Sequence, residues 1–245
     1  MLVALIVVAV AAVLLLGLTF LRRRSPAVLR QIPAYEKLNR AVGLAVEKGT
    51  RLHFSLGRGD FFAMRGSSAF AGLAMLRRLT ERTSVSDRPP VVTSGDPAIA
   101  LLSQDTLQAG YQAAGADEQY RPMTGRLTGL TPFAYAAGAI SVVRDENVSA
   151  NVLIGDFGVE AALLAEAADR DNTTLIAASD SLAAQSILYA SAQEPLLGEE
   201  LYASGAYVGA GVSHEASVQV QDVLRWLVIL AILAGAALKL AGVNF

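Results

Sequence analysis

The chain has 245 residues, 53% of them hydrophobic, with 20 basic and 22 acidic residues and a formal net charge of −2. It contains no cysteine, which excludes disulfides, thiolate zinc sites and thiol catalysis. Five basic residues flank the apolar ends, so residues 25–222 hold 15 basic and all 22 acidic residues, a formal charge of −7. Such an acidic segment is poorly suited to bind nucleic acid or anionic lipid headgroups, and no nucleic-acid partner is expected.

Residues 1–24 are predicted to form an N-terminal transmembrane anchor. Residues 1–21 carry no charged side chain, and a helix needs about 20 apolar residues to cross a bilayer. No basic residue precedes this run, and LRRRS follows it where a signal peptide would have a small-residue cleavage site. We therefore expect an uncleaved anchor, with Arg22–Arg24 on the cytoplasmic side and Met1 outside.

Residues 25–50 are predicted to be a linker containing an amphipathic helix over residues 33–47, followed by a Rossmann-like domain over residues 51–197. In this domain, short apolar runs alternate with stretches whose apolar residues recur at helical spacing. This order predicts an α/β fold with a doubly wound, mostly parallel sheet of about five strands, flanked by N- and C-terminal transmembrane helices. The predicted strands are 52–56, 91–93, 126–130, 151–154 and 174–178, and the predicted helices are 67–83, 98–114, 132–145, 159–169 and 182–190.

Residues 198–223 have no clear strand pattern and are predicted to be a connector of helix and loop. Residues 224–245 are predicted to form the second transmembrane helix, with Trp226 at the near interface and Lys239 reaching the far one. Two spans return the C-terminus to the side of the N-terminus. The sequence thus predicts a cell (inner) membrane protein with both termini outside and a cytoplasmic central domain.

Glycine and aspartate recur where the predicted strands end. In a parallel sheet, ligands collect beyond the carboxyl ends of the strands, so these residues are candidate ligand-binding positions. The alternative is that each aspartate caps the following helix and each glycine makes the turn. Residue type leaves both interpretations open. The positions are Gly57, Gly59, Asp60, Gly95, Asp96, Gly155, Asp156 and Asp180.

Signatures of known chemistry are largely missing. The sequence beginning at Gly57 resembles a dinucleotide fingerprint, but Phe62 stands where the third glycine belongs, and there is no P-loop, nucleophile elbow or H-E-x-x-H motif. His53 and His214 are the two histidines, and each is either a general base or a structural side chain. No catalytic residue or metal ligand is assigned, and the sequence identifies no cofactor.

Two segments repeat the pattern Tyr-Ala-small-Gly-Ala, at residues 135–139 and 202–206. Small residues four apart let a helix backbone approach a neighbour closely. The neighbour is either the sheet of the same domain or a second protomer.

The chain also resembles an uncharacterised bacterial family of two-span membrane proteins, known as a domain of unknown function. The resemblance covers nearly the whole chain and rests on segments such as IPAYEKLNRAVGLAVEKG, RPPVVTSGDP, NVLIGDFGVEAALL and QDVLRWLVILAILAG. It implies no activity, cofactor or site residue.

Two functions from different classes follow. The first is a membrane-tethered binding and assembly module that docks copies of itself or other subunits of a membrane complex, without turnover. The second is a small-ligand sensor or enzyme that uses the acidic, glycine-rich crevice beyond the strand ends. The sheet order is compatible with both.

Overall fold

The computed structural model describes residues 2–25, 28–59 and 66–241, with side chains from residue 4 onward. Asp60, one of the predicted ligand-binding residues, lies outside the described residues. The chain divides into two compact units, Met1–Leu29 with Gly211–Phe245, and Arg30–Ala210. We call the second unit the α/β domain.

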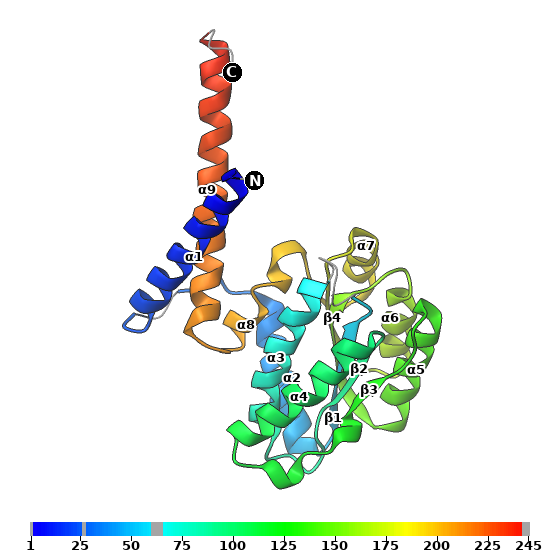
Figure 1. Cartoon of the computed structure of the whole chain (residues 1–245). Coiled ribbons are helices and arrows are strands. Elements are labelled where there is room, and N and C mark those ends of the chain that lie inside the picture. The colour runs from blue at the N-terminus through cyan, green and yellow to red at the C-terminus, as the bar shows by residue number, and fades with distance from the viewer. Residues whose placement is uncertain (1, 26–27, 60–65, 242–245) are drawn as a thin grey trace. The chain divides into compact units, whose positions relative to one another are not determined.

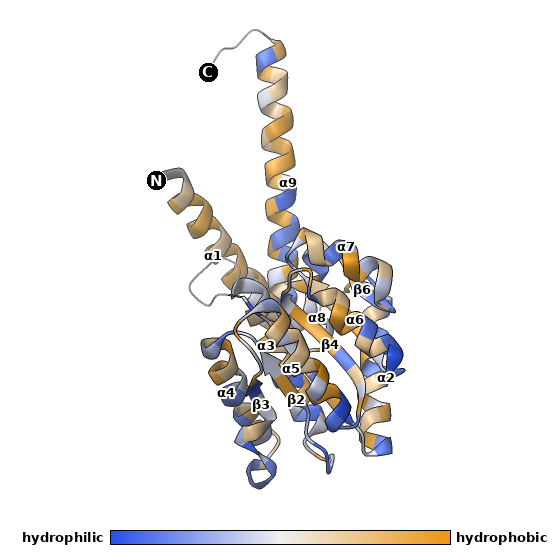
Figure 2. Cartoon of the chain, turned by 90° about the vertical axis from the view of Figure 1, so that its right-hand side faces the viewer, coloured by the Kyte–Doolittle hydropathy of each residue, from blue (hydrophilic) through white to orange (hydrophobic). Residues whose placement is uncertain are grey.

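The first unit consists of α1 (Leu2–Arg22) and α9 (Val212–Leu240). By length and composition, both helices are long and apolar enough to cross a membrane, and the apolar window of each is not buried by the protein itself. Figure 2 shows the apolar residues along α1 and along the C-terminal part of α9. Nε of Arg22 donates a hydrogen bond to Oε1 of Gln219 at 2.8 Å. Helix α9 begins 12 residues before the apolar stretch predicted from residue 224, because the preceding polar residues continue the same helix.

The α/β domain is built on a six-stranded sheet in which every strand pair is parallel, in the order β3-β2-β1-β4-β5-β6. This arrangement confirms the predicted doubly wound α/β class. The sixth strand, β6, was not predicted, since it is short and contains Pro195, which is tolerated only at a sheet edge. The strands are β1 (Arg51–Gly57), β2 (Val91–Ser94), β3 (Gly125–Leu127), β4 (Val148–Asp156), β5 (Thr174–Ser179) and β6 (Glu194–Leu196).

Helices cover both faces of the sheet (Figure 1). Helices α2, α3 and α4 pack on one face in a core around Phe54, and α5, α6 and α7 pack on the other face in a core around Leu153. The helices are α2 (Pro33–Lys48), α3 (Ser67–Thr83), α4 (Pro97–Ala113), α5 (Pro132–Asp145), α6 (Ala161–Arg170), α7 (Leu182–Ser191) and α8 (Ser204–Tyr207), with 3-10 turns η2 (Asp117–Gln119), η3 (Pro122–Thr124) and η4 (Gly198–Leu201).

Strand β1 presents different chemistry to the two faces. Leu52, Phe54 and Leu56 are buried in the core under α2, α3 and α4. His53 and Ser55 alternate with them and are also fully buried, because successive side chains of a strand point to opposite faces. Polar groups therefore lie inside the domain, where each needs a hydrogen-bond partner.

The two ends of the α/β domain are held together. The ring of Tyr35 in α2 stacks on that of Tyr207 in α8, with centroids 4.6 Å apart and an interplanar angle of 7°. The Tyr207 hydroxyl donates to the carbonyl of Arg30 at 2.6 Å, and the Arg30 guanidinium pairs with Glu200 at 2.5 Å. The chain thus enters and leaves the domain at one place, next to η4.

Candidate functional site

The strand order reverses between β1 and β4, which is where ligands bind in open parallel sheets. Here the two strand ends are in close contact. Gly57 has φ +70°, and an added Cβ would lie 2.3 Å from the carbonyl oxygen of Asp156. A Cβ on Gly155 would lie 2.1 Å from the carbonyl oxygen of Leu56. The Arg58 N–H donates to the Asp156 carbonyl at 2.8 Å, so these two glycines allow one strand to approach the other.

Gly95, at the end of β2, is used in the same way. Its N–H donates to the Gly57 carbonyl at 2.9 Å, and an added Cβ would lie 2.2 Å from Cγ of Arg58. Gly59, the residue after Arg58, is also buried. The space beside Gly57, Gly95 and Gly155 is therefore filled by the chain's own atoms.

The strand-end aspartates do not form one group. Asp96 caps α4, since its Oδ1 accepts a hydrogen bond from the Ile99 N–H at 2.9 Å. Asp156 is the last residue of β4 and Asp180 follows the neighbouring strand β5, and β1 separates both from Asp96. Oδ1 of Asp180 is buried and has no hydrogen-bond partner among the described residues. In that part of the chain, no three histidine, aspartate or glutamate side chains group as a metal site requires.

A charged pair at this edge was not predicted from the sequence. Glu160 is only 1% exposed, and its Oε1 accepts from the Gly158 N–H at 3.0 Å. A guanidinium nitrogen of Arg58 lies 3.9 Å from the same oxygen. A glutamate at the start of a helix is usually exposed, so the sequence contained no signal that Glu160 would be buried.

Buried polar side chains cross the sheet beneath α5 and α6. Nδ1 of His53 lies 2.9 Å from Oδ1 of Asn151, and Nε2 lies 2.9 Å from Oγ1 of Thr93. Burial lowers the pKa of His53 to about 4, so the ring is neutral at physiological pH. Both ring nitrogens are thus occupied by uncharged groups of the sheet. The structural interpretation of His53 fits this environment, since the side chain has no exposed surface.

The same chain of polar groups reaches the switch point. The Tyr135 hydroxyl, on α5, hydrogen-bonds to Oγ of Ser55 and accepts from the Gly57 N–H at 3.2 Å. Burial raises the pKa of Tyr135 to about 12, and the phenol is therefore a neutral partner for both groups. Tyr135 thereby ties α5 to the end of β1.

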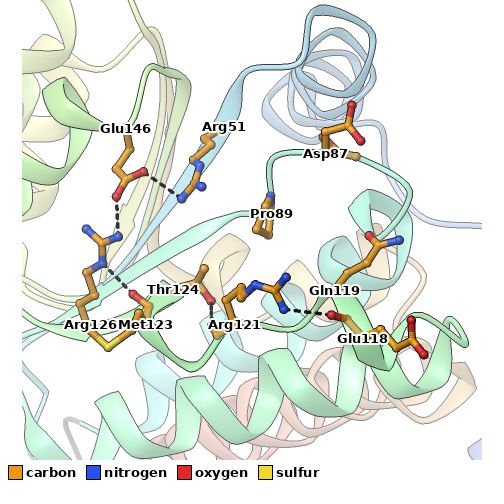
Figure 3. A pocket seen from close by; sticks show the side chains of 11 residues that line it. Arg51, Asp87, Pro89, Glu118, Gln119, Arg121, Met123, Thr124, Arg126 and Glu146 are labelled. Carbon is orange, nitrogen blue, oxygen red and sulfur yellow. Dashed lines mark hydrogen bonds and ion pairs between the residues drawn. The ribbon is translucent and has the colours of Figure 1, made fainter.

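A cavity of about 690 Å³ lies at the opposite, amino edge of the sheet. Figure 3 shows Arg51 and Arg126 reaching Glu146 from two sides. A guanidinium nitrogen of Arg51 lies 2.9 Å from Oε2 of Glu146, and Arg126 pairs with Oε1. Arg121, which donates to the carbonyl of Glu118 at 2.9 Å, lines the same cavity.

This cavity could not be found by the sequence argument. Its charged residues come from separate elements: β1, the turns before β2 and β3, β3 itself and the residue that follows α5. Nothing in their sequence spacing links them. Nε of Arg51 is buried without a hydrogen-bond partner among the described residues. Guanidinium groups match carboxylate and phosphate oxygens, but the lining has three acidic residues, Asp87, Glu118 and Glu146, beside its three arginines.

A family model described as a domain of unknown function, DUF6754, matches residues 1–245. The chain belongs to the DUF6754 family. No curated protein and no solved structure matches it. Membership of DUF6754 agrees with the resemblance seen in the sequence and assigns no activity to the switch point or to the amino-edge cavity.

Proposed function

We propose that the protein is a membrane-tethered binding and assembly module. In this proposal α1 and α9 span the cell (inner) membrane with both termini outside, and the α/β domain lies on the cytoplasmic side. The domain docks further copies of the chain or other subunits of a membrane complex, without turnover. The observation that carries the proposal is the absence of charged residues from α5 before its last two residues and from the whole of α7.

A helix on the surface of a soluble domain usually carries charged residues on its outer face. Helix α5 has none from Pro132 to Val143, and α7 has none over its whole length. Tyr189 of α7 is 67% exposed, and tyrosine is enriched in protein interfaces. These two uncharged surfaces lie on either side of α6, which carries the exposed pair Arg170 and Glu166. Their exposed residues are Phe133, Ala134, Ala137, Ser141, Leu182, Ala183, Ser186, Tyr189, Ala190 and Ser191.

The packing of the strand-end glycines is compatible with the same proposal. An added Cβ at Gly57 or Gly155 would collide with the neighbouring strand, so strand packing accounts for both glycines without a ligand. The first repeat of small residues also packs internally, because a Cβ on Gly138 would lie 2.5 Å from the carbonyl oxygen of Thr128. These groups hold the domain together and leave its outer surface to bind partners.

The test is the native mass of the full chain after gentle detergent extraction. We expect a stoichiometric complex that Tyr189→Glu or Ala137→Glu dissociates, because each places a charge in a dry contact. Gln108→Glu, at an exposed position of α4, is the matched control and should leave the mass unchanged. A wild-type monomer with no bound subunit would contradict the proposal.

The second candidate function is small-ligand binding, as a sensor or an enzyme. Oδ1 of Asp180, which has no hydrogen-bond partner among the described residues, favours a site at the carboxyl edge. At the amino edge, the cavity lined by three arginines and three acidic residues offers Arg121 to an anion. Thermal denaturation with phosphate, citrate or Mg²⁺ tests both. Stabilisation abolished by Asp156→Asn indicates the first site, and stabilisation abolished by Arg121→Ala indicates the second. If none of the three probes raises the melting temperature, this candidate fails.

A further inference from the structure

We infer that the carboxyl edge of the α/β domain is a lipid-contacting surface, which rests on the bilayer through a rim of exposed apolar side chains. This inference rests on the proposed membrane tether and adds to it the orientation of the domain. The carboxyl edge, where a doubly wound domain ordinarily binds a ligand, would here contact lipid.

Exposed apolar side chains are concentrated at this edge. In the described part of the α/β domain, 14 large apolar side chains are exposed. Seven of these lie in the loop that follows a strand, in the first turn of the helix after that loop, or at the end of η4. Leu182, the first residue of α7, is 80% exposed, and Phe133 of α5 is 63% exposed. We call these seven the apolar rim: Phe70, Leu130, Phe133, Val159, Leu182, Leu197 and Tyr202.

The residues of the rim come from five different segments, those that follow β1, β3, β4, β5 and β6. Because all six strands are parallel, their carboxyl ends lie at one edge, and the segments that follow them begin there (Figure 1). Three of the 14 exposed side chains, Val85, Met123 and Tyr189, lie in the segments or last helical turns that lead into β2, β3 and β6 at the opposite edge. Exposed apolar side chains gathered at one edge of a domain mark a site of contact with protein or membrane.

The path of the chain decides between these two occupants. Arg30 and Ala210 are the two ends of the domain, and Arg30 is bound to Glu200 of η4, which directly follows β6. The chain therefore passes to both apolar helices from the carboxyl edge. Seven residues join Arg22 to Arg30, a reach of at most about 25 Å. On the other side Gly211 alone precedes α9, whose residues 212–222 rise about 16 Å before the apolar stretch.

Because both tethers leave from the carboxyl edge, we expect this edge, and not the amino edge, to face the bilayer. Apolar side chains at such a surface are buried about 5–10 Å into the boundary between headgroups and acyl chains. The domain is acidic, so anionic headgroups repel it and the attraction has to be apolar. The contact should therefore persist in vesicles made of zwitterionic lipid.

The absence of cysteine allows a direct test on the full chain. Leu182→Cys places an environment-sensitive fluorophore on the rim, and Val85→Cys, where the side chain is 77% exposed, is the matched control at the amino edge. Each labelled chain is reconstituted in phosphatidylcholine vesicles with and without nitroxide groups on the acyl chains. We expect the Leu182→Cys label to lose most of its emission to the nitroxide and the Val85→Cys label to keep it.

Three outcomes would overturn the inference. Equal quenching of both labels would show that the carboxyl edge has no preference for lipid. No quenching of either label would place the rim away from the acyl chains. A Leu182→Cys label that is unquenched but protected, and becomes exposed when protein is diluted at constant lipid, would show that a second copy covers the rim. Failure of the chain to float with the vesicles would instead contradict the membrane tether of the proposed function.

Discussion

His53 on β1 and Asn151 on β4 are joined across the centre of the sheet, with Nδ1 of the imidazole 2.9 Å from Oδ1 of the amide. Nδ2 of Asn151 donates to Oγ1 of Thr173 at 2.7 Å, which leaves Oδ1 as the acceptor. The imidazole proton therefore lies on Nδ1, and Nε2 accepts from Thr93. The pair links the two strands between which the strand order reverses. This hydrogen-bond arrangement requires a neutral imidazole, because Nε2 acts as an acceptor.

The first prediction concerns pH. The pKa of His53 falls from 6.5 to about 4 on folding, mainly because of burial. Between these two pH values, His53 therefore carries a proton in the unfolded chain and none in the folded chain. The stability contributed by neutral His53 is complete above pH 6.5 and is lost as the pH falls toward 4. The loss is about 3 kcal/mol.

Urea denaturation of the full chain in mild detergent, followed by circular dichroism at several pH values, measures this loss. His53→Gln keeps hydrogen-bonding groups at the site but does not titrate, so its stability should fall less steeply with acid. Identical slopes for the wild type and the variant would show that His53 does not carry the pH dependence.

The second prediction concerns the hydroxyl that ties α5 to the switch point. Tyr135→Phe leaves the Gly57 N–H and the Ser55 hydroxyl without this partner in a fully buried site. We expect the free energy of unfolding to fall by about 1–3 kcal/mol. The control is Tyr189→Phe, at an exposed position, which should change it by less than about 0.5 kcal/mol. Equal effects of the two substitutions would contradict the assigned role of Tyr135.

The third prediction concerns the close contact between β1 and β4. In Gly155→Ala the new Cβ meets the Leu56 carbonyl oxygen at 2.1 Å, and the two central strands have to separate. We expect a loss of about 3 kcal/mol or more, or failure to fold. Gly43→Ala, in α2 with no atom within 4 Å of the new Cβ, should be neutral or stabilise the domain by up to about 1 kcal/mol. A tolerated Gly155→Ala would show that the strand ends have room for a ligand.

Parts of this fold are readable from the sequence, for local reasons. Pro132 and Asp145 bound α5 as predicted, because a first-turn proline and the helical spacing of apolar residues are local signals. Strand β6 was missed because Glu194–Leu196 is too short to show a period and contains a proline. The strand residues of β1 were predicted, but the burial of His53 and Ser55 depends on α5, which covers them from 80 residues away.

The candidate sites were less predictable, since they depend on which strands become neighbours. The sequence placed glycines and aspartates at strand ends, but it could not show that Gly57 would pair with Asp156 across the switch point. Nor could the sequence show that β1 would lie between the strand that ends at Asp156 and the strand that precedes Asp96. The amino-edge cavity joins Arg51, Arg126 and Glu146 from separate elements, and only the folded chain brings them together.

The accessibility of single cysteines measures on which side of the membrane the α/β domain and the end of α9 lie. The chain has no native cysteine, so Val85→Cys reports on the α/β domain and Ala241→Cys on the end of α9. In intact spheroplasts a membrane-impermeant maleimide should label Ala241→Cys at once, and Val85→Cys only after the membrane is permeabilised. Labelling of Val85→Cys in intact spheroplasts would contradict the central claim.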